Sequence, residues 1–225
     1  MRWGLRLSSW AQLAAIVAAV GLGAWGWHHW QGQRGLVALV EQNAELRRAI
    51  GNLTQESQIG YAKVTAQEVR DGRLVTRLKF VETHRTDPSR RLLEKEYEIA
   101  GDVVHFDALI VRFAPELIES GQAQALYLWR RVYGETMTPE EGFAIETPGD
   151  EPRRYADLCK TLSLADRQEF WQSIWDLANE PQRLADKGVT AIHGNVVYQR
   201  LRPGLLYVFK ITNSGDVTVE TVPDL

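Results

Sequence analysis

The sequence predicts an α+β domain, a mainly antiparallel sheet with a helical insert packed on it, that follows a transmembrane helix and a short coiled-coil-like helix. Three observations predict this fold class. A tryptophan-flanked apolar run stands near the N-terminus, a heptad pattern follows it, and residues 58–225 read as strands, then helices, then strands. That last ordering is typical of α+β domains in which terminal strands join one sheet.

The apolar run covers residues 10–30, and Gln12 is its only strongly polar side chain before Trp27. A helix needs about 20 such residues to cross the hydrocarbon core of a bilayer. Trp10 stands at one edge and Trp25 at the other, where indole rings favour the headgroup level. We therefore predict a single-pass signal anchor in the cell membrane, in contact with the lipid bilayer. The alternatives are a cleaved signal peptide, which the bulky exit GAWGWHH disfavours, and a buried soluble helix.

Charge gives the expected orientation and excludes one class of partner. Arg2 and Arg6 precede the span closely, which predicts residues 1–9 as a cytoplasmic tail and an external or periplasmic C-terminal domain. The net charge of −3 comes from 26 basic and 29 acidic residues, without the clustered basic excess of nucleic-acid-binding proteins. Cys159 is the only cysteine, so an intrachain disulfide is excluded.

Residues 36–57 predict a short coiled-coil stalk, because apolar residues recur there at heptad spacing. An Asn on such a seam can fix register and strand number. Small residues at four-residue spacing in the span would also let two helices approach closely. We expect a homo-oligomer or contacts with other membrane protein subunits; the alternative is a helix packed on its own domain. The predicted oligomerisation residues are Leu36, Leu39, Asn43, Leu46, Ile50 and Leu53 on the seam, and Ala15, Ala19 and Gly23 in the span.

Beyond the stalk, alternating patterns predict the strands of the domain. Asp71-Gly72 between two such runs is a strong hairpin signal. The run 103–113 is apolar on both faces, which favours a central strand covered on both sides. The basic stretch 86–91 and the acidic, Pro- and Gly-rich stretch 134–151 are expected to be loops. The predicted strands are 61–69, 73–84, 92–99, 103–113, 125–133, 196–201, 205–211 and 217–222, and the helical insert spans about 152–188.

One weak cluster could carry chemistry. His105 and Asp107 stand two residues apart on a strand and so share a face. His193 precedes another strand and could join them, as metal ligands or as a base oriented by the aspartate. The sequence has no HExxH, CxxC or GxSxG motif and no phosphate-binding loop. We therefore predict a non-catalytic domain without a cofactor; a tethered metal-dependent enzyme using these three residues is an alternative.

The strand 125–133 is the best candidate for a partner surface, because Trp, Tyr and Arg dominate interface hot spots. The surface would consist of Tyr127, Trp129, Arg131 and Tyr133. Two alternatives are a face covered by the helix that carries Trp171 and Trp175, and a lipid or small-molecule pocket between that helix and the sheet.

The order of short tail, single span, short coil and external domain resembles, over residues 1–57, bacterial bitopic cell-envelope assembly proteins, including the small coiled-coil divisome subunits. The resemblance implies a role in protein–protein interaction. We therefore expect an assembly or scaffold module of a membrane complex.

Overall fold

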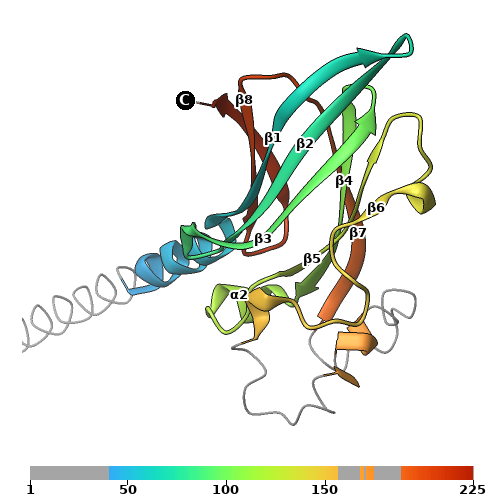
Figure 1. Cartoon of the computed structure of the whole chain (residues 1–225). Helices are drawn as coiled ribbons and strands as arrows, with labels where there is room; N and C mark the ends of the chain where they lie inside the picture. The colour runs from blue at the N-terminus through green and yellow to red at the C-terminus, as the bar shows by residue number, and fades with distance from the viewer. Residues whose placement is uncertain (1–40, 157–167, 170, 175–188, 225) are drawn as a thin grey trace, which may run out of the picture. The chain divides into compact units, whose positions relative to one another are not determined.

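The computed structural model describes residues 41–156, 168–169, 171–174 and 189–224, and the chain divides into units 1–48 and 49–225 (Figure 1). Residues 41–54 are helical. Within the described residues, no helix is long and apolar enough to cross a membrane. The predicted span 10–30, with Ala15, Ala19 and Gly23, lies outside the described residues, as do Leu36 and Leu39.

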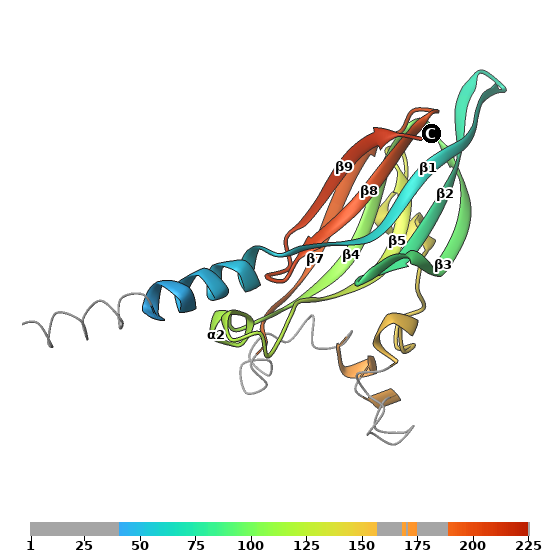
Figure 2. The same ribbon diagram turned by 90° about the vertical axis from the view of Figure 1, so that its left-hand side faces the viewer.

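The larger unit consists of two antiparallel sheets with a few short helices (Figures 1 and 2), which confirms the mainly antiparallel α+β prediction. The first sheet has the order β3-β2-β1-β8-β9 and the second the order β6-β5-β4-β7, where we had predicted one sheet. The elements are β1 (Glu56–Arg70), β2 (Arg73–His84), β3 (Asp87–Ala100), β4 (Val103–Phe113), α2 (Pro115–Glu119), β5 (Leu126–Gly134), η1 (Pro139–Glu141), β6 (Phe143–Ala144), η2 (Arg153–Tyr155), β7 (Val189–Arg200), β8 (Leu205–Thr212) and β9 (Val217–Pro223).

The structure tests the predicted hairpin turn at Asp71-Gly72 and the predicted loop over 86–91. The hairpin between β1 and β2 turns at Asp71 and Gly72, whose φ angles are 52° and 75°, so the Asp-Gly prediction is confirmed. The loop predicted over 86–91 is wrong, because β3 begins at Asp87 and pairs with β2 from there. β3 is an edge strand, and an exposed edge tolerates the proline and charges that we interpreted as loop signals.

The main core lies between the two sheets and is largely aromatic. Phe106 and Phe209, from opposite sheets, meet edge to face at 4.7 Å between ring centroids, and Phe80 meets Trp129 at 5.1 Å. The other face of β4 also packs, because Leu109 joins a second cluster with Trp171. The prediction that β4 is a central strand covered on both faces is therefore confirmed.

A bulge in β5 reverses which side chains of the strand face the main core. Ala108 pairs with Trp129 and Asp107 with Arg131, so Arg130 is an extra residue without an opposite partner on β4. Before the bulge Trp129 points into the main core, and after it Val132 does. A single inserted residue reverses the alternation of all side chains beyond it.

The bulge corrects the predicted partner surface. Tyr127 and Trp129 are each 1% exposed and belong to the main core, so they form no surface. Arg131 and Tyr133 lie beyond the bulge, on the opposite face of β5. The covered-face alternative is also wrong for Trp129, because Trp171 packs with Leu128 on the other side of the strand.

We expect Gly60→Ala to destabilise the domain by about 1–3 kcal/mol, the usual cost of overpacking. A Cβ at Gly60 would lie 2.6 Å from the carbonyl oxygen of Val81 on the neighbouring strand. Gly51→Ala is the matched control, because a Cβ there meets nothing within 4 Å and Ala favours the helix by about 1 kcal/mol. Urea unfolding of both variants measures the difference, and equal midpoints would contradict the close approach.

Candidate functional site

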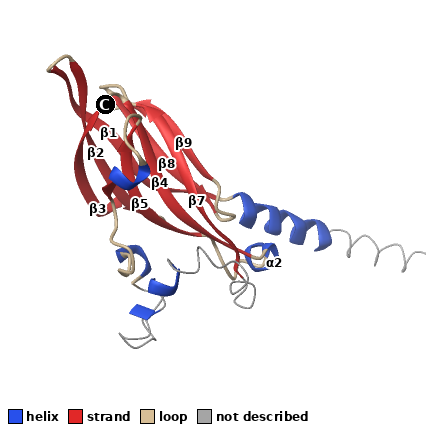
Figure 3. Ribbon diagram, turned by 90° about the vertical axis from the view of Figure 1, so that its right-hand side faces the viewer, coloured by secondary structure: helices blue, strands red, loops and turns tan. Residues whose placement is uncertain are grey.

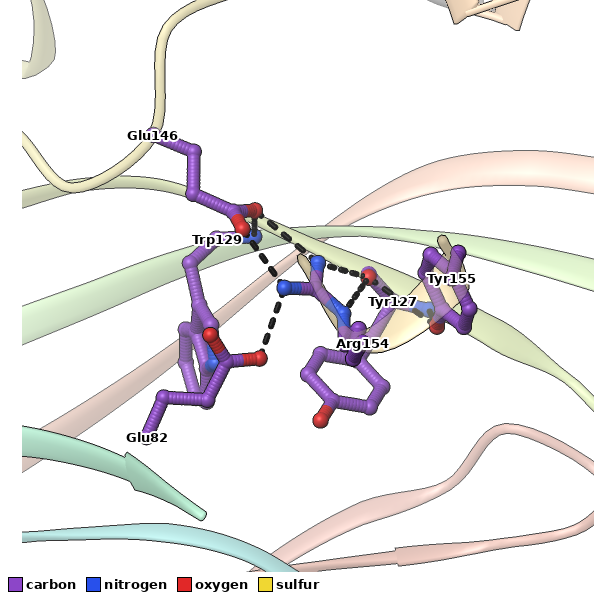
Figure 4. Close-up of polar contacts among 6 residues, drawn as sticks. All are labelled: Glu82, Tyr127, Trp129, Glu146, Arg154 and Tyr155. Atoms are coloured by element: carbon purple, nitrogen blue, oxygen red, sulfur yellow. Dashed lines mark hydrogen bonds and ion pairs between the residues drawn. The ribbon is translucent and has the colours of Figure 1, made fainter. Parts of the chain in front are cut away.

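The densest polar site of the described residues surrounds Arg154, whose side chain is only 4% exposed (Figure 4). Its Nη1 donates to Glu82 Oε1 at 2.6 Å and to Glu146 Oε1 at 2.5 Å. Its Nη2 donates to Glu146 Oε2 at 2.9 Å, and its Nε donates to the carbonyl oxygen of Tyr127 at 3.1 Å. We call Arg154, Glu82 and Glu146 the arginine clamp.

The clamp joins elements that are far apart in sequence. Glu82 comes from β2 of the first sheet, whereas Tyr127 belongs to β5 of the second. Glu146 also accepts a 2.7 Å hydrogen bond from the backbone N–H of Trp129. The guanidinium of Arg154 lies 4.3 Å from the ring centroid of Tyr127 and 4.8 Å from that of Tyr155. The two sheets and the segment after β6 are therefore held at one buried cation.

The charges of the clamp do not balance, because two carboxylates share one guanidinium. Burial raises the pKa of Glu82 to about 7; Arg154 opposes that rise and the neighbouring Glu146 carboxylate adds to it. Burial disfavours the charge of Arg154, but Glu146 and Glu82 still raise its pKa well above the ordinary value. Glu82 therefore changes protonation near neutral pH while Arg154 stays charged.

A cleft of about 410 Å³ opens beside the clamp. Its lining includes Glu82, Glu146 and residues 92–95 of β3, the strand that pairs with β2 beside Glu82. It is a different place from the predicted pocket between the sheet and the Trp171 segment, where Trp171 is fully buried and stacks on Tyr155 at 5.4 Å.

What the clamp can do chemically follows from its hydrogen bonds. Glu82 and Glu146 both accept from the same guanidinium, so the arrangement fixes structure rather than presenting a free nucleophile or base. Sequence reasoning missed it, because Glu82 and Arg154 are 72 residues apart. The sequence signal for the clamp is that Glu82 continues the alternating row of the buried Leu78 and Phe80 on β2.

Asp107, which belongs to the metal-dependent alternative, lies on β4 as a buried ion-pair partner. Its Oδ1 accepts from Arg130 Nη2 at 2.7 Å, and its Oδ2 lies 3.3 Å from Arg131 Nε. The bulge in β5 brings both arginines to this one carboxylate. Gly194 on β7 leaves them room, since a Cβ there would lie 2.5 Å from Arg130 Nη2.

The predicted His105 packs between two tyrosines. Its ring lies 4.8 Å from that of Tyr133, nearly parallel, and 6.0 Å from that of Tyr198. The backbone of His193 pairs with Ile110 of β4, and the His193 side chain is not among those described. In the part of the chain that the structure describes, no group of three or more His, Cys, Asp or Glu side chains could hold a metal ion.

Comparison with known proteins adds no family to this description. No protein family, curated protein or solved structure matches the chain. The class of protein is therefore defined by the described residues themselves: a domain of two antiparallel sheets joined by a buried arginine clamp.

We expect Arg154→Met to destabilise the domain by about 3–5 kcal/mol, because it leaves the buried Glu82 and the half-buried Glu146 without their cation. Arg153→Met is the matched control, since Arg153 is exposed and adjacent in sequence. Thermal unfolding followed by circular dichroism compares the two. A loss shared equally by both variants would show that the clamp carries no special stability.

We expect Glu82→Gln to flatten the dependence of stability on pH. The folded pKa of Glu82, about 7, lies above its ordinary value of 4.5, so the folded protein holds the proton more tightly. The free energy of unfolding of the wild type therefore falls as pH rises from about 4.5 to 7, by about 3 kcal/mol from this group. The variant should be the more stable protein at pH 8.

Urea titrations at pH 5 and pH 8 measure this difference, with Glu96→Gln as an exposed control on β3. Parallel pH profiles for wild type and Glu82→Gln would contradict the assignment of the titration to the clamp.

Proposed function

We propose that the chain is a single-pass membrane-anchored protein that acts by association, with the two-sheet domain as a non-catalytic assembly module of a membrane complex. Residues 10–30 would anchor it, with the N-terminus in the cytoplasm and the domain external or periplasmic. Leu46 and Ile50 carry the proposal, because these seam residues are 58% and 50% exposed on the helical segment 41–54.

Exposed apolar side chains at heptad spacing support a partner helix. Leu46 is the d position of one heptad and Ile50 the a position of the next, and the exposed Asn43 stands at the preceding a position. Water disfavours such a stripe, and a second helix would bury it. A helix of this length is marginal alone, so the membrane anchor would supply the local concentration that pairing needs.

The charged groups of the domain support a non-catalytic role. Asp107 is held by Arg130 and Arg131, and the two clamp carboxylates are held by Arg154. Carboxylates held in this way position strands and loops. The association proposal therefore agrees better with these ion pairs than the metal-dependent alternative does.

We expect full-length chain to stay in the membrane fraction after carbonate washing, and amine-reactive crosslinking to yield oligomers. Leu46→Glu with Ile50→Glu should lower the crosslinked fraction at least about tenfold, equivalent to 1.4 kcal/mol. Asn43→Leu should change the number or register of the crosslinked chains, since it removes the polar seam residue.

Glu45→Gln with Arg48→Gln is the matched control, because both residues are exposed and stand at c and f positions, away from the seam. Chain released by carbonate would contradict the anchor, and crosslinking unchanged in the Leu46/Ile50 variant would contradict the seam.

A further inference from the structure

β7 is a long edge strand. It pairs with β4 along one side over residues 189–200, and no other described strand pairs with its second side. Figures 2 and 3 show β7 along the margin of the domain, beside β9 of the other sheet. On that side the backbone N–H and C=O groups of β7 form no ladder with any described strand, as is typical of an edge strand.

The other edges of the two sheets carry the usual protection against pairing, and β7 does not. β3 contains Pro88 and six charged residues between positions 90 and 98, and the short β9 contains Glu220 and Pro223. Charges and prolines on an edge discourage strand addition. From Gly194 to Gln199, β7 has neither, and it exposes Val196 by 45% and Tyr198 by 69%.

A row of aromatic rings crosses the second sheet and ends at this edge. Tyr133, His105 and Tyr198 stand opposite one another on β5, β4 and β7. The ring centroids of Tyr133 and His105 are 4.8 Å apart, about the spacing of neighbouring strands, and those of His105 and Tyr198 are 6.0 Å apart with the rings tilted. Tyr198 is the last ring, so a strand added to β7 would place its own side chain at the next position of the row.

We propose that β7 pairs antiparallel with β7 of a second copy of this chain, with Tyr198 opposite Tyr198 and the two four-stranded sheets joined into one. An antiparallel pair of identical strands is self-complementary about a two-fold axis. In this register Arg200 falls opposite Val196, so the only charge of residues 194–200 meets no like charge. Asp102 also lies 3.6 Å from Arg200 and compensates it.

A second copy of this chain is favoured over a strand of another protein, because the proposed function already brings copies of the chain together. One strand pair buries little area, so β7 pairing would be weak between free domains. Copies held together by an anchor and the helical seam meet at an effective concentration of the order of millimolar. The inference therefore rests on the proposed association, and it identifies the surface by which the domains themselves meet.

Disulfide crosslinking in native membranes tests the pairing, with the full-length chain in a Cys159→Ala background. We expect Tyr198→Cys to form a dimer on mild oxidation, because its two copies stand opposite each other. Val69→Cys, 72% exposed near the β1–β2 turn, is the control and should remain at least about fivefold less crosslinked. Equal crosslinking at both positions, or capture of a different protein by Tyr198→Cys, would overturn the proposal.

A second substitution keeps the test independent of cysteine reactivity. Val196→Lys, added to Tyr198→Cys, places a lysine opposite Arg200 and should lower the dimer yield at least about fivefold, whereas Val69→Lys should not. Undiminished yield would overturn the register.

Leu46→Cys reports on the seam separately. Crosslinking at Leu46 without crosslinking at Tyr198 would overturn the β7 pairing and leave the proposed function standing. Crosslinking at neither position would overturn both.

Discussion

The structure depends most on the need to satisfy one buried guanidinium. Arg154 is almost wholly removed from water, and a charge in that position is tolerated only with ionic and hydrogen-bonding partners around it. Those partners come from β2, from the backbone of β5 and from Glu146 in the segment after β6. The clamp thus fixes the course of an acidic, Pro- and Gly-rich segment that has little apolar surface of its own to bury.

A second constraint follows from the bulge at Arg130. Without the extra residue, β5 would keep Tyr127, Trp129 and Arg131 on one face, and a guanidinium would enter the aromatic core. The bulge moves Arg131 to the side on which Arg130 lies, where both arginines pair with Asp107, and it returns Val132 to the core. One inserted residue therefore keeps the core apolar and also creates the Asp107 ion pairs.

Local patterns in the sequence predicted local structure well and long-range structure poorly. The bounds of β2 and β4 and the Asp71-Gly72 turn follow from alternation and turn chemistry, and the structure confirms them. The division into two sheets did not follow, because pairing partners depend on register between distant strands.

The sites show the same limit. A bulge has no signal in a strand whose side chains are large on both faces, so the predicted face of Tyr127 to Tyr133 was wrong. The clamp could not be predicted either, since Glu82 and Arg154 meet only after the two sheets have packed. The structure buries Trp129 and exposes instead Tyr198, the last ring of a row that begins with the buried Tyr133 and continues through His105.

The outer faces of the two sheets carry different side chains, and this difference bears on where a partner would bind. The first sheet carries ion pairs on its exposed residues, namely Lys63–Asp224, Arg70–Glu98, Arg77–Glu98, Lys79–Glu94 and Lys210–Glu220. Exposed pairs contribute at most about 1 kcal/mol each, so their main effect is a well-solvated face. The outer face of the second sheet carries the ion pairs of Asp107 together with a row of aromatic rings that ends at the edge strand β7. The proposed β7 pairing uses the edge of this second sheet, where residues 194–199 carry no charge.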